Sequence, residues 1–198
     1  MGLNFEYLEG QTPIDEEEKL GLKVPIVSVK RELDEFEQKN IEDAMLWSLS
    51  NRWEARTVFS AEFLKKVHKQ MFKQVWSWAG QYRMTNKNIG VEYWKVASEA
   101  KQLIDDAHHW YEYNVYVRLE LAIRFKHRLV SIHCFPNGNG RHSRLMADII
   151  MSHVYKQPVF TWGSRSSLPA SEIRSTYIRA LKQADRGEFG PLIEFAES

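Results

Sequence analysis

The stretch Ser131–Leu145, SIHCFPNGNGRHSRL, separates two apolar helical patterns and is rich in histidine, asparagine, glycine and arginine. Gly138 and Gly140 flank Asn139, so the backbone can adopt positive φ angles and turn several N–H groups toward one point. We expect a helix to begin at about Gly140, and the unpaired N–H groups of its first turn would face the same point. The stretch therefore predicts an anion-binding nest at the start of a helix.

The side chains around this nest indicate phosphate chemistry. Arg141 and Arg144 lie three residues apart, so they share one face near the N-terminus of the predicted helix. Cations at that helix end are unfavourable for stability, which indicates a function. Donors spread over more than one turn fit a phosphate chain better than a single carboxylate.

Two further residues of the stretch can act on a bound phosphate. His133, just before the nest, can take a proton from an incoming hydroxyl at neutral pH. Asn137 offers an amide oxygen to a metal ion, although a carboxylate is the stronger magnesium ligand. A Gly-Asn-Gly loop alone is usually only a turn, and the stretch lacks the lysine and spacing of a Walker A loop. His142 is expected to be exposed, and no residues complete a zinc site.

Composition limits the classes of function. The chain has 198 residues, of which 43% are hydrophobic, enough for one buried core. Its 27 basic and 26 acidic residues nearly balance, so nucleic acid is not the default partner. The single cysteine, Cys134, excludes an intrachain disulfide and suits a reducing compartment. With no secretory signal and no apolar run long enough for a membrane span, we expect a soluble cytoplasmic protein.

The chain divides into an irregular arm over residues 1–30 and a single helical domain over 31–198. Apolar periodicity and capping residues predict the helices. They are expected at about 31–51, 61–76, 99–113, 119–130, 140–154, 170–186 and 191–198. The segments QYRMT and VEYWKV are rich in β-formers and flank an NKNIG turn, which predicts a small β-hairpin near 82–96. The predicted fold is all-α, a helical bundle with this hairpin.

The motif residues resemble the Fic (Fido) family, whose signature is H-x-F-x-[DE]-G-N-G-R-x-x-R. The matching positions are His133, Phe135, Gly138, Asn139, Gly140, Arg141 and Arg144. The segments WAGQYR and YIRALKQADRGEFGPLIEF are also similar to the family, so the resemblance covers about Ile41 to the C-terminus. The pairing of NGNGRHSR with GQTP near the start is similar to the bacterial Fic subgroup called mobile mystery protein B.

This resemblance implies a Fic-type bundle that transfers AMP from ATP to a Ser, Thr or Tyr hydroxyl of a target protein, releasing pyrophosphate. It implies that His133 is the general base and that a Mg²⁺ or Mn²⁺ ion is bound at the position of Asn137. The remaining implied roles concern phosphate binding and a flap that holds the target by strand-like pairing. The phosphate-binding residues would be Gly138, Asn139, Gly140, Arg141 and Arg144, and the flap residues Ile89, Gly90, Val91, Glu92 and Tyr93.

Asn137 departs from the family pattern, because a neutral amide replaces the metal-binding carboxylate. The alternatives are therefore transfer of another phosphate-linked group, such as UMP or phosphocholine, or a catalytically weak nucleotide-binding regulator. The latter could be the toxin-like half of a module with an antitoxin-like partner. Gly140 and Arg144 argue against a Doc-like kinase. The inhibitory pattern [ST]-x-x-x-E-[GN] is best approached by Ser50 and Glu54, although Thr12–Glu16 and Ser28–Glu32 also fit its first part.

Overall fold

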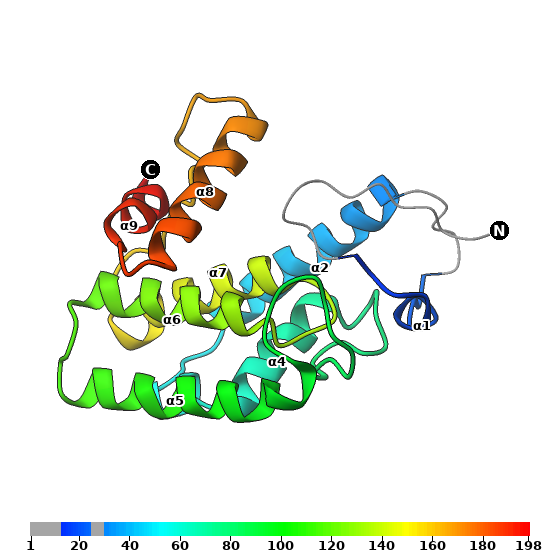
Figure 1. Cartoon of the computed structure of the whole chain (residues 1–198), viewed down its shortest axis with the longest axis horizontal. Helices are drawn as coiled ribbons and strands as arrows, with labels where there is room; N and C mark the ends of the chain where they lie inside the picture. The colour runs from blue at the N-terminus through cyan, green and yellow to red at the C-terminus, as the bar shows by residue number, and fades with distance from the viewer. Residues whose placement is uncertain (1–12, 25–29) are drawn as a thin grey trace.

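The computed structural model describes residues 13–24 and 30–198, and helices form most of this part (Figure 1). The N-terminal half contains α1 (Glu16–Lys19), α2 (Lys30–Leu49), α3 (Ala55–Val58), α4 (Ala61–Phe72), the short 3-10 helix η1 (Tyr93–Lys95) and α5 (Val96–Glu112). The C-terminal half contains α6 (Arg118–Ile132), α7 (Asn139–Ile149), its π-helical continuation η2 (Ile150–Val154), α8 (Ala170–Ala184) and α9 (Gly190–Glu197). The all-α prediction is confirmed.

The core forms where α2 packs on α4, and α6 packs on both α5 and α7. Helix α4 shows how the sequence directs this packing. The Ser60 side chain caps it by accepting the Phe63 N–H at 3.2 Å. The apolar face of α4, which includes Phe63, Leu64 and Val67, is buried. As Figure 1 shows, α6 and α7 run through the middle of the molecule, so the loop between them is supported by several helices.

The predicted β-hairpin near 82–96 is wrong. No strand occurs among the described residues; Gln81–Glu92 is an irregular loop that leads into η1. Side chains occupy the backbone groups that a hairpin would pair. The buried Arg83 guanidinium donates to the carbonyls of Thr85, at 2.8 Å, and Val91. The Asn86 side chain accepts the N–H of Tyr93 at 2.9 Å. The β-forming residues therefore lie in a loop shaped by long polar side chains.

The described part of the N-terminal arm lies against the region between α4 and this loop. Lys23 N–H donates to Val75 O and Ser77 N–H to Gly21 O, both at 2.8 Å. The Trp78 indole also donates to Glu18 O at 3.1 Å. Residues 1–12 and 25–29 lie outside the described residues, so the division into an arm over 1–30 and a domain over 31–198 stays a prediction. No helix in the described part is both long and apolar enough to cross a membrane.

Candidate functional site

His133 ends α6 in a left-handed conformation, with φ of 60°. This conformation is uncommon for a residue other than glycine, and it turns the chain sharply into the nest. The residue is only 4% exposed, and Nδ1 of its ring lies 3.3 Å from Val130 O. Because a carbonyl can only accept, this bond requires the proton on Nδ1, and the neutral ring then carries its lone pair on Nε2. His133 thus has the tautomer of a proton acceptor.

The surroundings of His133 keep its imidazole neutral at physiological pH. Burial lowers its pKa to about 4, and the positive charges of Arg83 and Lys87 act in the same direction. The hydrogen bond to Val130 O opposes them by favouring the protonated ring. A base works best when its pKa is close to the operating pH, so this buried arrangement holds the histidine deprotonated but weakly basic.

The glycines of the predicted nest occupy different surroundings. Gly138 precedes α7 with φ of 77°, and a Cβ there would lie 2.4 Å from the Phe72 ring. At Gly140 a Cβ would meet nothing within 4 Å, so space is open beside the first turn of α7. The helix begins at Asn139, and the N–H groups of a first turn have no acceptor inside their own helix. The start of α7 therefore presents backbone donors beside open space.

Asn139 shapes the loop through its side chain. It accepts the Phe135 N–H at 2.9 Å and donates to Phe135 O at 2.8 Å, and it is only 4% exposed. These bonds join the two ends of the turn that separates His133 from α7. Only the backbone of Asn139 can therefore take part in a phosphate cradle.

His68 on α4 supports the loop from beneath, and sequence reasoning missed it. Gly80 N–H donates to its Nδ1 at 3.0 Å, so Nε2 carries the proton and donates to Asn137 O, also at 3.0 Å. The ring stacks on Phe135 with the ring centres 3.8 Å apart.

The expectation that His142 is exposed is wrong. It is 1% exposed, because it lies on the core-facing side of α7, where Nε2 contacts Leu64 O at 3.0 Å.

The two motif arginines lie in different surroundings. Arg141 Nη1 forms an ion pair with Glu37 Oε2 of α2 at 2.6 Å, and Glu37 also accepts the Trp76 indole N–H at 2.6 Å. Arg144 instead faces the Tyr177 ring of α8, with its guanidinium carbon 5.6 Å from the ring centre. Glu37 was missed as well, although a carboxylate in register with Leu33 and Ile41 on the buried face of α2 is a visible signal.

Asn137 does not suit the metal ion that the resemblance implies. Its Oδ1 accepts the Gly138 N–H at 2.6 Å and lies 3.4 Å from Arg141 Nη2. Both donors therefore point at the oxygen that would bind a cation. In the part of the chain that the structure describes, no group of three or more His, Cys, Asp or Glu side chains could hold a metal. The described residues around the nest do not fit a magnesium site.

The loop that replaces the hairpin crosses His133. Val91 N–H donates to Ile132 O at 3.3 Å, and Arg83 Nε donates to His133 O at 2.6 Å. Gly90, with φ of 103°, approaches so closely that a Cβ would lie 2.5 Å from His133 Cβ. The other predicted flap residues lie nearby on the loop, and the side chains of Ile89, Glu92 and Tyr93 are exposed. We call residues 84–92 the flap loop.

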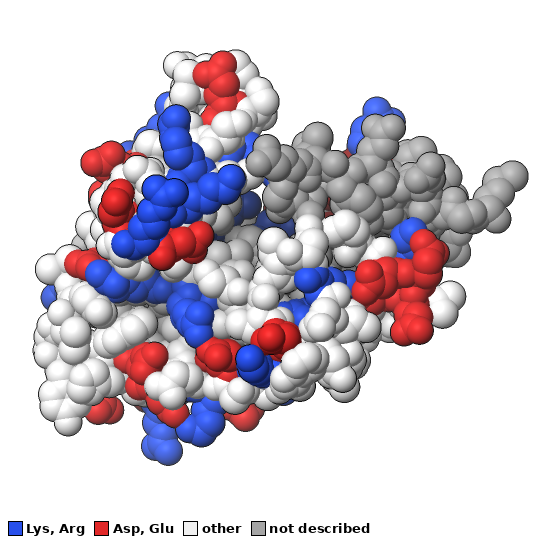
Figure 2. Space-filling view, in the orientation of Figure 1, with Lys and Arg blue, Asp and Glu red and all other residues white. Residues whose placement is uncertain are grey.

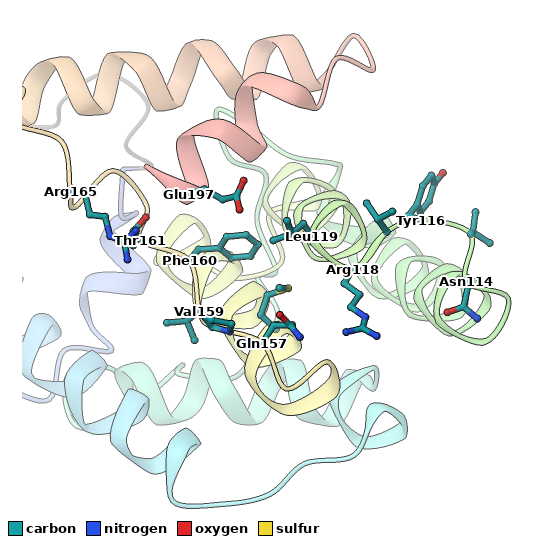
Figure 3. A pocket seen from close by; sticks show the side chains of 14 residues that line it. Asn114, Tyr116, Arg118, Leu119, Gln157, Val159, Phe160, Thr161, Arg165 and Glu197 are labelled. Carbon is teal, nitrogen blue, oxygen red and sulfur yellow. The ribbon is translucent and has the colours of Figure 1, made fainter.

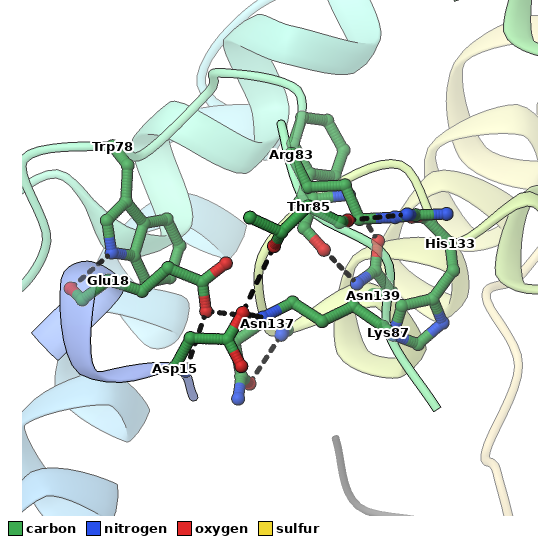
Figure 4. Close-up of polar contacts among 11 residues, drawn as sticks. Asp15, Glu18, Trp78, Arg83, Thr85, Lys87, His133, Asn137 and Asn139 are labelled. Carbon is green, nitrogen blue, oxygen red and sulfur yellow. Dashed lines mark hydrogen bonds and ion pairs between the residues drawn. The ribbon is translucent and has the colours of Figure 1, made fainter. Parts of the chain in front are cut away.

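A buried lysine fastens the flap loop to the N-terminal arm (Figure 4). The side chain of Lys87 is 2% exposed, and Nζ lies 2.7 Å from Asp15 Oδ2 and 2.5 Å from Glu18 Oε2. Thr85 Oγ1 donates to the same Asp15 oxygen at 3.1 Å. Sequence reasoning missed this contact, because about 70 residues separate its partners along the chain.

Ser50 and Glu54 do not lie on a common helix. Ser50 follows the end of α2, where its hydroxyl donates to Leu46 O at 2.9 Å, and Glu54 is the exposed N-cap residue of α3. No ion pair joins Glu54 to Arg144 among the described residues. The carboxylate that does contact a motif arginine is Glu37.

A cavity of about 870 Å³ lies away from the motif (Figure 3). Its apolar lining includes Met151 and Phe160, and Arg118, Arg165 and Glu197 contribute charged groups. None of its lining residues belongs to the motif stretch or the flap loop. This cavity is therefore not the predicted phosphate site.

Comparisons with known proteins find a family match for the region around the motif. Residues 58–151 match the Fic/DOC family. The protein adenylyltransferase Fic of Drosophila grimshawi is 28% identical over 119 residues, which are 59% of this chain and 23% of that protein. The chain thus spans less than a quarter of this relative. These matches support the family but not the mobile mystery protein B subgroup, which was suggested partly by residues 10–12, outside the described residues.

Solved structures share the fold. The N-terminal FIC domain of a VirB-translocated effector protein from Bartonella sp. 1-1C has a TM-score of 0.68 at 16% identity, with 90% of each chain covered. The BepC effector protein of Bartonella tribocorum, solved with bound AMPPNP, has a TM-score of 0.65 at 17% identity. That likeness covers 86% of this chain and 87% of the other. Residues 58–151, which contain the motif, therefore match the Fic/DOC (Fido) family, and the chain is distantly related to protein adenylyltransferases.

Proposed function

We propose that the protein transfers AMP from ATP to a Ser, Thr or Tyr hydroxyl of a target protein. The observation that carries this proposal is the position of His133 just before the backbone donors of residues 139–141, at the junction of α6 and α7. A proton acceptor and an anion site are thus joined by one short, rigid loop. That combination suits attack by a hydroxyl on a bound phosphate.

In this reaction, Nε2 of His133 takes the proton of the target hydroxyl. The hydroxyl oxygen forms a bond to the α-phosphorus, the bond from that phosphorus to the bridging oxygen of the β-phosphate breaks, and pyrophosphate leaves. The first turn of α7 binds the phosphates through its N–H groups and the positive end of the helix dipole. The bound AMPPNP of the Bartonella tribocorum structure supports a nucleoside triphosphate as the donor.

The arginines supply the positive charge on the pyrophosphate side. Arg144 forms no ion pair with a carboxylate among the described residues, and it stabilises the leaving group. Arg141 contributes once it exchanges Glu37 for a phosphate oxygen. A divalent ion would add positive charge at the phosphates when bound, but the donors around Asn137 do not fit it, so no step here depends on one.

The target protein binds along the edge of the flap loop. Ile89, Glu92 and Tyr93 point outward beside the covered histidine, so an extended target segment laid along 89–93 would bring its hydroxyl to His133. The 4% exposure of His133 means that the flap loop has to move before the hydroxyl can reach Nε2.

The burial of His133 also favours a second candidate function. The protein would then be a nucleotide-binding regulator that transfers AMP slowly, or only after a partner protein moves the flap loop.

The test is to incubate the chain and a soluble protein extract with ATP radiolabelled at either the α or the γ phosphate. AMP transfer predicts protein-bound label from the α position alone. Label from the γ position would instead identify a kinase. Parallel reactions with α-labelled UTP and with CDP-choline labelled in choline test the two alternative groups. Nucleotide binding without label on any protein would favour the regulator.

A further inference from the structure

Arg144 and Asp148 of α7 influence each other electrostatically, but they form no ion pair. Asp148 lies one turn further along α7, at the spacing that suits an ion pair. Its carboxylate instead accepts the Trp162 indole N–H at 3.0 Å and the Phe160 N–H at 3.2 Å. In the described part of the chain, no carboxylate forms an ion pair with Arg144. Its guanidinium is held by an aromatic ring.

That ring belongs to Tyr177 of α8, and a second basic residue also contacts it. Lys126 of α6 is fully buried, and its Nζ donates to Tyr177 Oη at 2.5 Å while lying 4.4 Å from the ring centre. The Arg144 guanidinium carbon is 5.6 Å from the same centre. Three helices thus meet at one tyrosine, and two of them contribute a basic side chain that forms no ion pair among the described residues.

Such an arrangement is costly unless it serves an anion. Burial and the nearby Arg144 charge lower the pKa of Lys126 well below its ordinary value. An aromatic ring attracts a cation to its face, but it does not neutralise the charge. Figure 2 also shows Lys and Arg side chains gathered over the C-terminal helices, where α8 carries Arg174, Arg179 and Lys182. The local charge therefore attracts the distal end of a phosphate chain.

We propose that Tyr177 and Lys126 are positioning residues for Arg144. The ring holds the guanidinium toward the nest, and the Lys126 hydrogen bond fixes the ring. This inference rests on the proposed function for the identity of the donor, and it assigns to Tyr177 the preference for triphosphate over monophosphate. It also makes α8, which packs mainly on α9, part of the phosphate site.

The test measures binding of the non-transferable analogue α,β-methylene ATP, of AMP and of inorganic tripolyphosphate by calorimetry. Tyr177→Leu should weaken binding of the analogue and of tripolyphosphate about tenfold, the scale of a partly desolvated cation–π contact. AMP binding should stay within about twofold, because AMP lacks the phosphates that Arg144 would bind. Tyr177→Phe, which keeps the ring, should lose less than Tyr177→Leu, and Lys126→Met should resemble Tyr177→Phe.

A double-mutant cycle separates positioning from general structure. If Tyr177 acts through Arg144, Arg144→Ala combined with Tyr177→Leu should bind the analogue no more weakly than Arg144→Ala alone. Tyr155→Leu is the matched control, because the Arg118 guanidinium carbon lies 5.8 Å from the centre of the Tyr155 ring. Arg118 lines the cavity of about 870 Å³, away from the motif. It should leave all three affinities unchanged.

Additive losses, or an equal loss of AMP binding, would overturn the inference, as would a wild-type chain that binds neither triphosphate nor tripolyphosphate. The proposed transfer fails independently, through absence of α-label on protein, even when the cycle shows coupling with tripolyphosphate.

Discussion

Glu37 and Arg141 join α2 to the start of α7 through an ion pair of 2.6 Å, with the Glu37 side chain only 4% exposed. The Glu37 carboxylate therefore pairs with the Arg141 guanidinium, which would otherwise be available to bind a phosphate chain. The Arg141 side chain remains 31% exposed, so it can be reached from solvent while it is paired. This contact makes the resting site less positive than its sequence indicates.

Glu37→Gln should tighten binding of α,β-methylene ATP by about threefold to tenfold, because the phosphates no longer compete with a buried carboxylate. The Trp76 indole can still donate to the amide oxygen, so folding should weaken by only about 1–2 kcal/mol. Calorimetry and urea unfolding measure the two effects. Asp43→Asn, on the exposed Lys39 pair of the same helix, is the control. Unchanged or weaker nucleotide binding in Glu37→Gln would refute competition.

His133 should titrate near pH 4 in the nucleotide-free protein, well below an ordinary histidine. Its pKa is lowered by folding, so the charged ring is disfavoured and the residue destabilises the fold progressively as the pH falls from about 6.5 toward 4. Bound phosphate should raise the pKa, because a nearby anion favours the imidazolium. Proton–carbon NMR of the histidine rings, with His133→Gln used for assignment, measures both values. A free-state pKa near 6.5 would mean that the ring is not covered as described.

Lys87→Met should loosen the flap loop, because Asp15 and Glu18 lose the cation between them. Amide hydrogen exchange over residues 84–92 should become about tenfold faster, corresponding to a loss of about 1.4 kcal/mol of local stability. Lys95→Met, which removes an exposed pair with Glu92 at 3.0 Å, is the matched control and should change little. Equal exchange in the two variants would show that the lysine contact does not hold the loop.

Asn137→Asp should make label transfer depend on divalent metal. A carboxylate at this position would still accept the Gly138 N–H and would add the charge that Mg²⁺ prefers. We expect addition of EDTA to reduce transfer by the variant about tenfold or more and that by the wild-type chain about twofold or less. The same EDTA sensitivity in both proteins would show that the amide does not set the metal dependence.

The sequence patterns were sufficient for the longer helices and for the turn at the motif, but not for the short helices α1 and α3. Apolar spacing along α2, α4 and α7, and the capping hydroxyl of Ser60, act locally and can be recognised in a short window. The hairpin failed because Arg83 reaches carbonyls at 91, 132 and 133, and propensity carries no information about such distant partners.

The candidate site was predictable only in its contiguous part. The nest and His133 follow one another in the chain, so their proximity was visible. Other elements contribute residues that contact the motif stretch or the flap loop. The local sequence around these residues does not indicate which residue they contact; they are Glu37, His68, Lys87 and Tyr177. The exposure of His142 was misjudged for a related reason, because the side of α7 that meets α4 depends on packing.

The central claim is that His133 removes the proton from the attacking hydroxyl while the start of α7 holds the phosphates. The most direct measurement compares α-labelled ATP transfer and α,β-methylene ATP binding in wild type and His133→Ala. The account predicts that the variant loses transfer by at least about a hundredfold, the usual scale of general-base catalysis, and binds the analogue within about threefold of wild type. Transfer that persists at the wild-type rate in His133→Ala would contradict it.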